Sequence, residues 1–91
     1  MADILVWDGR EIPVLGRHEV LVCGGGPAGF AAAVASARNG TRTMMLERHG
    51  FPGGMASAGM VNPIYGFFAR HIQIVTGIPQ ELIDRLAQIP G

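Results

Sequence analysis

The sequence predicts an α/β fold centred on a parallel β-α-β unit, and three observations support this prediction. A run at residues 19–23, apolar after Glu19, ends in a cluster of glycines. An alanine-rich stretch at residues 30–38 follows the cluster, and a second apolar run at residues 43–46 follows that stretch. Residues 20–22 are apolar at consecutive positions, which is typical of a strand buried on both faces of a parallel sheet.

The glycines between the first strand and the helix have the spacing GxGxxG. Gly24 is expected to form the tight turn, because glycine tolerates backbone angles that a side chain forbids. Gly26 leaves room for a pyrophosphate to approach the backbone, and Gly29 lets helix and strand pack closely. The first-turn amides of the helix have no intrahelical partners, so with the helix dipole they form an anion site. Pro27 suits this start because proline lacks an N–H, and an N–H at the first helical position would be unpaired within the helix in any case.

The end of the helix and the end of the second strand complete the pattern. Asn39 and Gly40 form a helix stop signal. Glu47 follows the second strand, eighteen residues after Gly29. An acid there is expected to accept hydrogen bonds from a ribose 2′-hydroxyl and to repel a 2′-phosphate. The whole pattern predicts a Rossmann-like βαβ dinucleotide-binding unit; the alternative is an ordinary glycine turn and a solvated acid.

The glycine-rich run at residues 23–29, followed by a second glycine pair, resembles the FAD-dependent oxidoreductases. More narrowly, residues 10–14, 47–67 and 77–86 resemble the bacterial FAD-dependent oxidoreductase family, and the middle segment is the most specific. The resemblance implies that FAD is the cofactor. It also implies that Glu47 holds the adenosine ribose and Arg48 covers the adenosine side.

In this family resemblance, the first glycine loop takes the pyrophosphate, and the second runs beside it towards the flavin. The cofactor-binding residues expected on this basis are Gly24, Gly25, Gly26, Pro27, Ala28, Gly29, Glu47, Arg48, Gly53, Gly54, Met55, Ala56 and Ser57. Ala58 and Asn62 depart from the family pattern, in which a hydroxyl residue and a glycine are common. Residues 50–59 hold four glycines and a proline. Ordering so many glycines costs backbone entropy, so such a loop is expected where a ligand needs close approach to the backbone.

Two other functions compete with the FAD-binding oxidoreductase. An NAD(P)-dependent dehydrogenase uses the same signature but does not require the glycine pair at 53 and 54. A truncated, non-catalytic product that acts only through protein contacts is the third hypothesis. The expected partners are an unidentified small-molecule substrate and an electron donor or acceptor. No nucleophile–base pair stands out, and the three histidines show no metal spacing, so the catalytic residues are unknown.

Composition indicates that much of the chain is covered by more protein. Because the chain also stops before any third parallel strand, the family resemblance implies that it is the N-terminal part of a larger FAD/NAD(P)-binding domain. Hydrophobic residues make up 48% of its 91 residues and charged residues only 15%. So few charges do not coat the large surface of so short a chain. We therefore expect the remainder of its own chain or a partner subunit to cover it.

The charge pattern argues against several partners. Seven arginines, no lysine and seven acids give zero net charge without a basic cluster, which argues against nucleic acid and membrane surfaces. The amino terminus lacks a signal-peptide pattern, so a cytoplasmic location is expected. Cys23, the single cysteine, is expected to be an inert packing residue at a buried strand end.

The chain divides into four expected segments. They are an extended leader with a turn at Asp8 and Gly9 (1–17), the βαβ unit (18–47), the glycine-rich cofactor loop (48–63), and an apolar segment with a helix (64–91). Residues 64–76 lack a clean period. Tyr65 there is expected to be a core aromatic residue, and the alternative is a ring that faces the flavin. Residues 79–89 predict a helix with an i,i+4 pair between Glu81 and Arg85. Its apolar face would hold Leu82, Ile83, Leu86 and Ile89.

Overall fold

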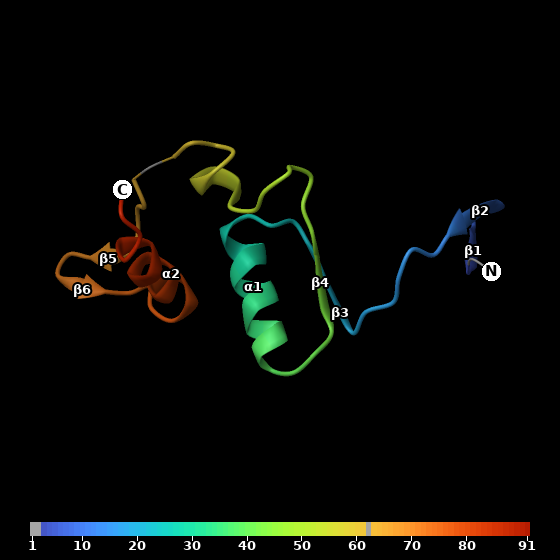
Figure 1. Cartoon of the computed structure of the whole chain (residues 1–91), viewed down its shortest axis with the longest axis horizontal. Helices are drawn as coiled ribbons and strands as arrows, with labels where there is room; N and C mark the ends of the chain where they lie inside the picture. The colour runs from blue at the N-terminus through green and yellow to red at the C-terminus, as the bar shows by residue number, and fades with distance from the viewer. Residues whose placement is uncertain (1–2, 62) are drawn as a thin grey trace.

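The computed structural model describes residues 3–61 and 63–91 and contains three two-stranded sheets and two α-helices (Figure 1). Strands β1 and β2 pair antiparallel, β3 and β4 pair parallel, and β5 and β6 pair antiparallel. In chain order the elements are β1 (Ile4–Trp7), β2 (Arg10–Pro13), β3 (Val20–Cys23), α1 (Pro27–Arg38), β4 (Thr43–Leu46), the 3₁₀ helix η1 (Gly54–Ala56), β5 (Phe68–Ala69), β6 (Ile72–Gln73) and α2 (Ile78–Ala87).

The central unit has the predicted order of strand, helix and strand. Val20 pairs with Thr43 and Cys23 with Leu46, so the carboxyl ends of β3 and β4 lie at the same edge. Helix α1 packs against both strands. It ends as expected at Asn39, whose side-chain amide donates to the carbonyl of Ala35 at 2.7 Å.

The expectation that the first strand is buried on both faces is wrong for the described residues. Helix α1 covers one face of the β3–β4 sheet, and the side chains on the other face remain exposed. Leu21 is 54% exposed and Leu46 is 51% exposed. Cys23 is also exposed, which corrects its assignment as a buried packing residue.

The leader forms a hairpin rather than an extended segment. Asp8 and Gly9 both have positive φ, at 48° and 71°, as in the two-residue turns that match the twist of antiparallel strands. The turn predicted there is confirmed. Both strands are exposed along their whole length, and the hairpin stands away from β3 and β4 instead of lying on them (Figure 1). An isolated two-stranded hairpin is marginally stable in water, so this one needs a surface to pack on.

The carboxyl-terminal segment resolves the stretch that lacked a period. Residues 64–76 contain the short hairpin of β5 and β6 and no helix. Helix α2 follows, as predicted, but ends before Ile89. The expected pair between Glu81 and Arg85 is present, with 2.9 Å between the closest nitrogen and oxygen.

An unpredicted ion pair joins the two helices. Arg38 at the end of α1 donates two hydrogen bonds to the carboxylate of Glu81 in α2, at 2.7 and 2.9 Å. The paired guanidinium groups of Arg38 and Arg85 lower the pKa of Glu81 to about 2. Arg38 and Glu81 are 43 positions apart, so this exposed pair links α2 to the β-α-β unit.

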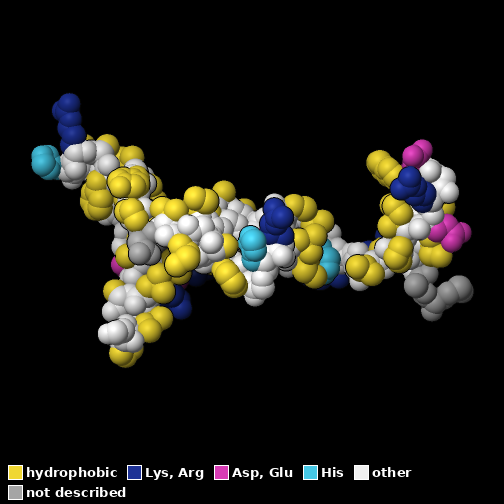
Figure 2. All heavy atoms as spheres, turned by 90° about the horizontal axis from the view of Figure 1, so that it is seen from above, with side chains coloured by type: hydrophobic (Ala, Val, Ile, Leu, Met, Phe, Trp, Pro, Cys, Tyr) yellow, Lys and Arg dark blue, Asp and Glu magenta, His cyan; other side chains and the backbone are white. Residues whose placement is uncertain are grey.

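The described residues do not enclose a hydrophobic core. None of their apolar side chains is buried, and apolar side chains are spread over the face shown in Figure 2. The radius of gyration is 17.4 Å, whereas a compact chain of this length has about 12 Å. The accessible surface is 7635 Å², against about 5,100 Å² for a compact protein of this mass. This surface is much larger than a self-sufficient domain of 91 residues exposes.

We predict that the isolated 91-residue chain does not fold cooperatively. Hydrophobic burial is the main favourable term in folding, and here it is too small to offset chain entropy. Small-angle scattering should give a radius of gyration clearly above the compact value, and calorimetry should show no sharp transition. A compact monomer with a sharp melting transition would contradict the prediction.

A second prediction concerns Glu81 and acid. Its folded pKa lies below its ordinary value, so its pairing stabilises the protein at neutral pH. That contribution is lost as pH falls from about 4.5 towards about 2. In the full-length protein, Glu81→Gln should therefore lower the free energy of unfolding at pH 7. The difference in this free energy between the variant and wild type should be smaller at pH 2.5, as measured by urea unfolding. Asp84→Asn, a like substitution on the same helix, is the control and should show no such convergence.

Candidate functional site

The candidate site lies where the carboxyl ends of β3 and β4 meet the start of α1. Three residues far apart in sequence, Gly25, Glu47 and Gly53, meet there through the backbone N–H and carbonyl of Gly25. The N–H of Gly25 donates to Oε2 of Glu47 at 2.8 Å, and the carbonyl of Gly25 accepts from the N–H of Gly53 at 2.8 Å. Among the described residues only Gly25 is buried.

The first glycine loop has the geometry expected of its glycines. Gly24 has a φ of 105°, in the region that favours glycine, and its N–H donates to the carbonyl of Leu46 at 2.8 Å. A Cβ on Gly29 would lie 1.7 Å from the carbonyl oxygen of Gly24, so helix and strand pack too closely for a side chain. A Cβ on Gly26 would meet nothing within 4 Å. Gly26 therefore borders open space.

The backbone amides of the first loop fall into two groups. Those of Gly24 and Gly25 donate to Leu46 and Glu47, as described above. Those of Gly26, Ala28 and Gly29 donate to no described residue, and Pro27 has no N–H. Unpaired amides at a helix start are able to bind an anion without a basic side chain.

Glu47 is half-buried at the end of β4 and acts as an acceptor for backbone amides. Its carboxylate accepts from His49 N–H at 3.3 Å and from Gly25 N–H at 2.8 Å. These two amides, His49 first, lower the pKa of Glu47, so the side chain is anionic at neutral pH. The sequence reasoning missed its bond to the first loop. The parallel pairing of Cys23 with Leu46 was the available signal, because it places the residues after both strands side by side.

The second glycine loop packs directly on the first. Gly53 and Gly54 have φ of 119° and 55°, and a Cβ on Gly54 would lie 2.8 Å from Cα of Gly26. The loop continues into η1, where Met55 and Ala56 are exposed. Ser57 closes it, since its hydroxyl donates to the carbonyl of Pro52 at 2.6 Å. Both predicted glycine loops therefore belong to one cluster.

Other candidate residues lie outside this cluster. Arg48 is exposed and forms no ion pair with a described residue. His49 stacks on Phe51 with 6.2 Å between ring centroids. Tyr65 is 87% exposed, which corrects its assignment as a core aromatic residue. Ala58 is exposed, and Asn62 lies outside the described residues.

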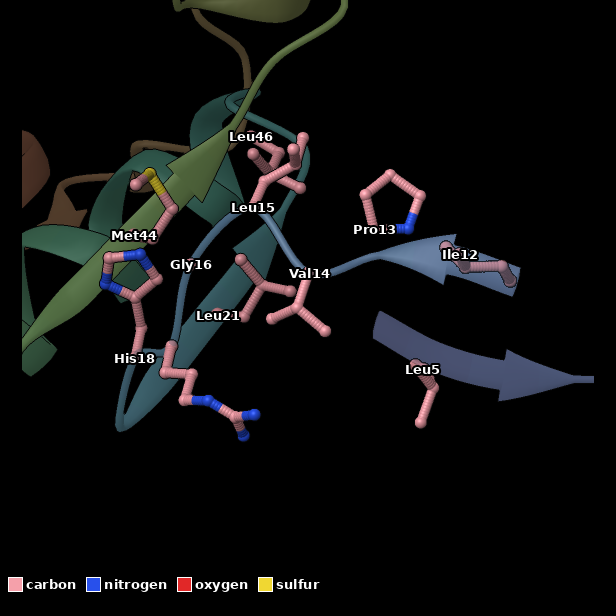
Figure 3. Close-up of a pocket in the computed structure, with 11 residues that line it drawn as sticks. Leu5, Ile12, Pro13, Val14, Leu15, Gly16, His18, Leu21, Met44 and Leu46 are labelled. Atoms are coloured by element: carbon pink, nitrogen blue, oxygen red, sulfur yellow. The ribbon is translucent and has the colours of Figure 1, made fainter. Parts of the chain in front are cut away.

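Two apolar hollows lie beside the central unit. One, of about 630 Å³, lies between the leader and the uncovered sheet face, and its lining includes Val14, Leu21, Met44 and Leu46 (Figure 3). The other, of about 420 Å³, lies next to the second glycine loop. Its wall includes Pro27, Phe30, Gly53, Tyr65 and Leu82. Neither lining contains an acid–base pair.

The described residues offer no cluster of histidine, cysteine and carboxylate side chains that would hold a metal ion. In the same part of the chain, neither helix has the length and apolarity needed to cross a bilayer.

Comparison with known proteins gives one family and several partial relatives. The model of the FAD dependent oxidoreductase family matches residues 19–91. Dihydrolipoyl dehydrogenase of Trypanosoma brucei brucei is 40% identical over 45 residues, which are 50% of this chain and 9% of the relative. No solved structure matches the chain.

A second kind of relative covers more of the chain. The tRNA 5-methylaminomethyl-2-thiouridine biosynthesis bifunctional proteins MnmC of Pseudomonas savastanoi pv. phaseolicola and Pseudomonas syringae pv. syringae are each 35% identical over 65 residues. Those residues are 71% of this chain and 10% of each relative. The chain thus spans about a tenth of the length of the curated relatives it matches.

Gly26 and Gly29, two glycines of the GxGxxG spacing, should respond differently to the same substitution. In the full-length protein, Gly29→Ala should lower stability by about 1–3 kcal/mol, because its Cβ overlaps the Gly24 carbonyl and forces α1 from β3. Gly26→Ala should leave the melting temperature of the ligand-free protein near wild type, because its Cβ enters open space.

The dinucleotide affinity separates the two variants further. Gly26→Ala should weaken binding at least about tenfold, since its Cβ takes the space of the ligand. Calorimetry of the ligand-free proteins and titration with the dinucleotide measure the two effects. Equal binding by Gly26→Ala and wild type would rule out a ligand at this position.

Proposed function

Because the chain belongs to the FAD dependent oxidoreductase family, we propose that its β3-α1-β4 unit is the Rossmann-like FAD-binding part of a flavin-dependent oxidoreductase. The protein binds FAD, as its family does. Two observations carry the assignment to these residues. The backbone N–H and carbonyl of Gly25 are bound by Glu47 and Gly53, and the neighbouring Gly26 borders open space.

The residues around Gly26 fit the pyrophosphate of FAD. The free amides of Gly26, Ala28 and Gly29 supply donors for its oxygens. The helix dipole of α1 favours negative charge at the same end. The close contact of Gly54 with Gly26 brings the second glycine loop, residues 53–57, to the same place.

Glu47 fits the adenosine ribose. It is anionic, and each carboxylate oxygen has more than one acceptor position, so its bond to Gly25 leaves capacity for ribose hydroxyls. The charge would repel a 2′-phosphate, which disfavours NADP. Arg48, exposed on the next residue, would cover the adenosine side.

Bound FAD supplies the redox chemistry, accepting or donating a hydride or electrons. The described residues bind and orient the cofactor, and none of them forms a nucleophile–base pair. We propose that the small-molecule substrate and the electron donor or acceptor bind against residues beyond this unit. The partial coverage of the relatives supports this arrangement.

We further propose that the chain is the N-terminal portion of a larger FAD-binding domain, divided into the leader 1–17, the βαβ unit 18–47, the cofactor loop 48–63 and the segment 64–91. The remainder of its own chain or a partner subunit would cover the apolar face of β3 and β4. The exposure of Leu21 and Leu46 supports this proposal.

Glu47 provides the test of this function. The purified full-length protein should carry a yellow chromophore with the absorption of oxidised flavin. Glu47→Gln should weaken FAD binding about 10–100-fold, because hydrogen bonds to a charged acceptor are worth about 1.5–3 kcal/mol. Fluorescence titration of the apoprotein with FAD measures this.

Glu19→Gln is the matched control. Glu19 also accepts a backbone N–H, that of Arg42 at 2.6 Å, but beside the opposite end of β3. It should bind FAD as wild type does. A colourless protein that binds NAD instead would contradict the flavin assignment, and equal FAD affinity of Glu47→Gln and wild type would contradict the role of Glu47.

A further inference from the structure

Ser57 makes one side-chain hydrogen bond among the described residues, and it is directed into its own loop. Its Oγ donates to the carbonyl of Pro52 at 2.6 Å, five residues earlier in the chain. Gly53 lies inside the loop closed by this bond: a Cβ on Gly53 would lie 2.1 Å from Oγ of Ser57. The hydroxyl therefore occupies the space beside Gly53 and fixes the path of the backbone there.

The loop closed by Ser57 is joined to the first glycine loop at Gly53. The N–H of Gly53 donates to the carbonyl of Gly25 at 2.8 Å, while the N–H of Gly25 is held by Glu47. The next residue, Gly54, would touch Cα of Gly26 at 2.8 Å if it carried a Cβ. The position of Gly53 thus determines how the second loop supports the first.

The chemistry of a hydroxyl group limits what Ser57 does for a phosphate. A serine hydroxyl has a single hydrogen to donate. While this hydrogen is given to Pro52, it is not available to a phosphate oxygen. The side chain is therefore committed to the protein rather than to the ligand.

We propose that Ser57 is a positioning residue for FAD: its hydroxyl closes the second glycine loop, and through the bond between Gly53 and Gly25 it holds the first loop ready for the pyrophosphate. This inference rests on the proposed function of the first loop. Residues 50–59 contain four glycines, each with a large entropy to lose on ordering. A bond that orders them before FAD arrives lowers the cost of binding.

The experiment compares hydrogen exchange in full-length apoprotein with FAD affinity. Ser57→Ala should speed deuterium uptake several-fold in peptides covering residues 22–30 and 50–60 of the apoprotein, as read by mass spectrometry. It should also weaken FAD binding about fivefold, the worth of one ordinary hydrogen bond. Ser57→Thr retains the hydroxyl and should restore both values. Thr76→Ala, which removes an exposed hydroxyl outside both glycine loops, is the control and should match wild type.

The outcomes separate this inference from the function on which it rests. Wild-type exchange in Ser57→Ala apoprotein, with weaker FAD binding, would mean that the hydroxyl contacts the ligand directly and would overturn the inference. Failure of Ser57→Thr to restore exchange would also overturn it. If Ser57→Ala does not fold, Ser57→Cys takes its place. Its thiol is of similar size but a weak donor, so this variant should also show faster exchange and weaker FAD binding. Faster exchange in a protein that binds no FAD would support the loop closure and refute the proposed function.

Discussion

The backbone of Gly25 is the point on which the candidate site depends. Its N–H is bound by a carboxylate from the end of β4, and its carbonyl is bound by an amide from the second glycine loop. It is the one buried residue of the described chain. Buried backbone polar groups must find partners, and here both partners come from segments that follow α1. The conformation of the first loop is therefore supported by β4 and by the second loop.

Hydrogen bonding at the site and burial of apolar side chains differ in how far the described residues complete them. Both backbone polar groups of Gly25 have partners among the described residues, whereas none of the apolar side chains there is buried. Helix α1 shields one face of β3 and β4, and Leu21 and Leu46 face outwards on the other. The β1–β2 hairpin adds two more exposed strands. Local geometry at the site is thus specified by hydrogen bonds, whereas the apolar side chains of the described residues remain exposed.

The sequence was sufficient to predict elements whose signals are local. Glycine and proline positions predicted the start of α1, the turn at Asp8 and Gly9 and the end at Asn39, because these residues restrict backbone angles directly. The place of Glu47 followed from the strand before it. The close contact at Gly29 followed from the known spacing of the signature.

Features that depend on long-range contacts were not predicted. Burial of β3 was overestimated because a run of apolar residues does not reveal what covers it. The ion pair of Arg38 with Glu81 joins helices 43 positions apart, and no sequence period connects them. The bond of Gly53 to Gly25 likewise requires a folded second loop. Ser57 entered the candidate site as a cofactor contact, but its side chain is turned to Pro52.

The free donors that face the open space at Gly26 belong to the main chain, and this has an evolutionary consequence. A side chain that supplies a contact is lost by a single codon change, whereas an amide is retained by every residue except proline. Ala28 is therefore free to drift among residues that suit a helix start, without altering the donors offered to a ligand. Selection should act instead on the few positions where an added carbon collides with its surroundings, so that lineages of this protein diverge widely around an almost fixed skeleton of glycines.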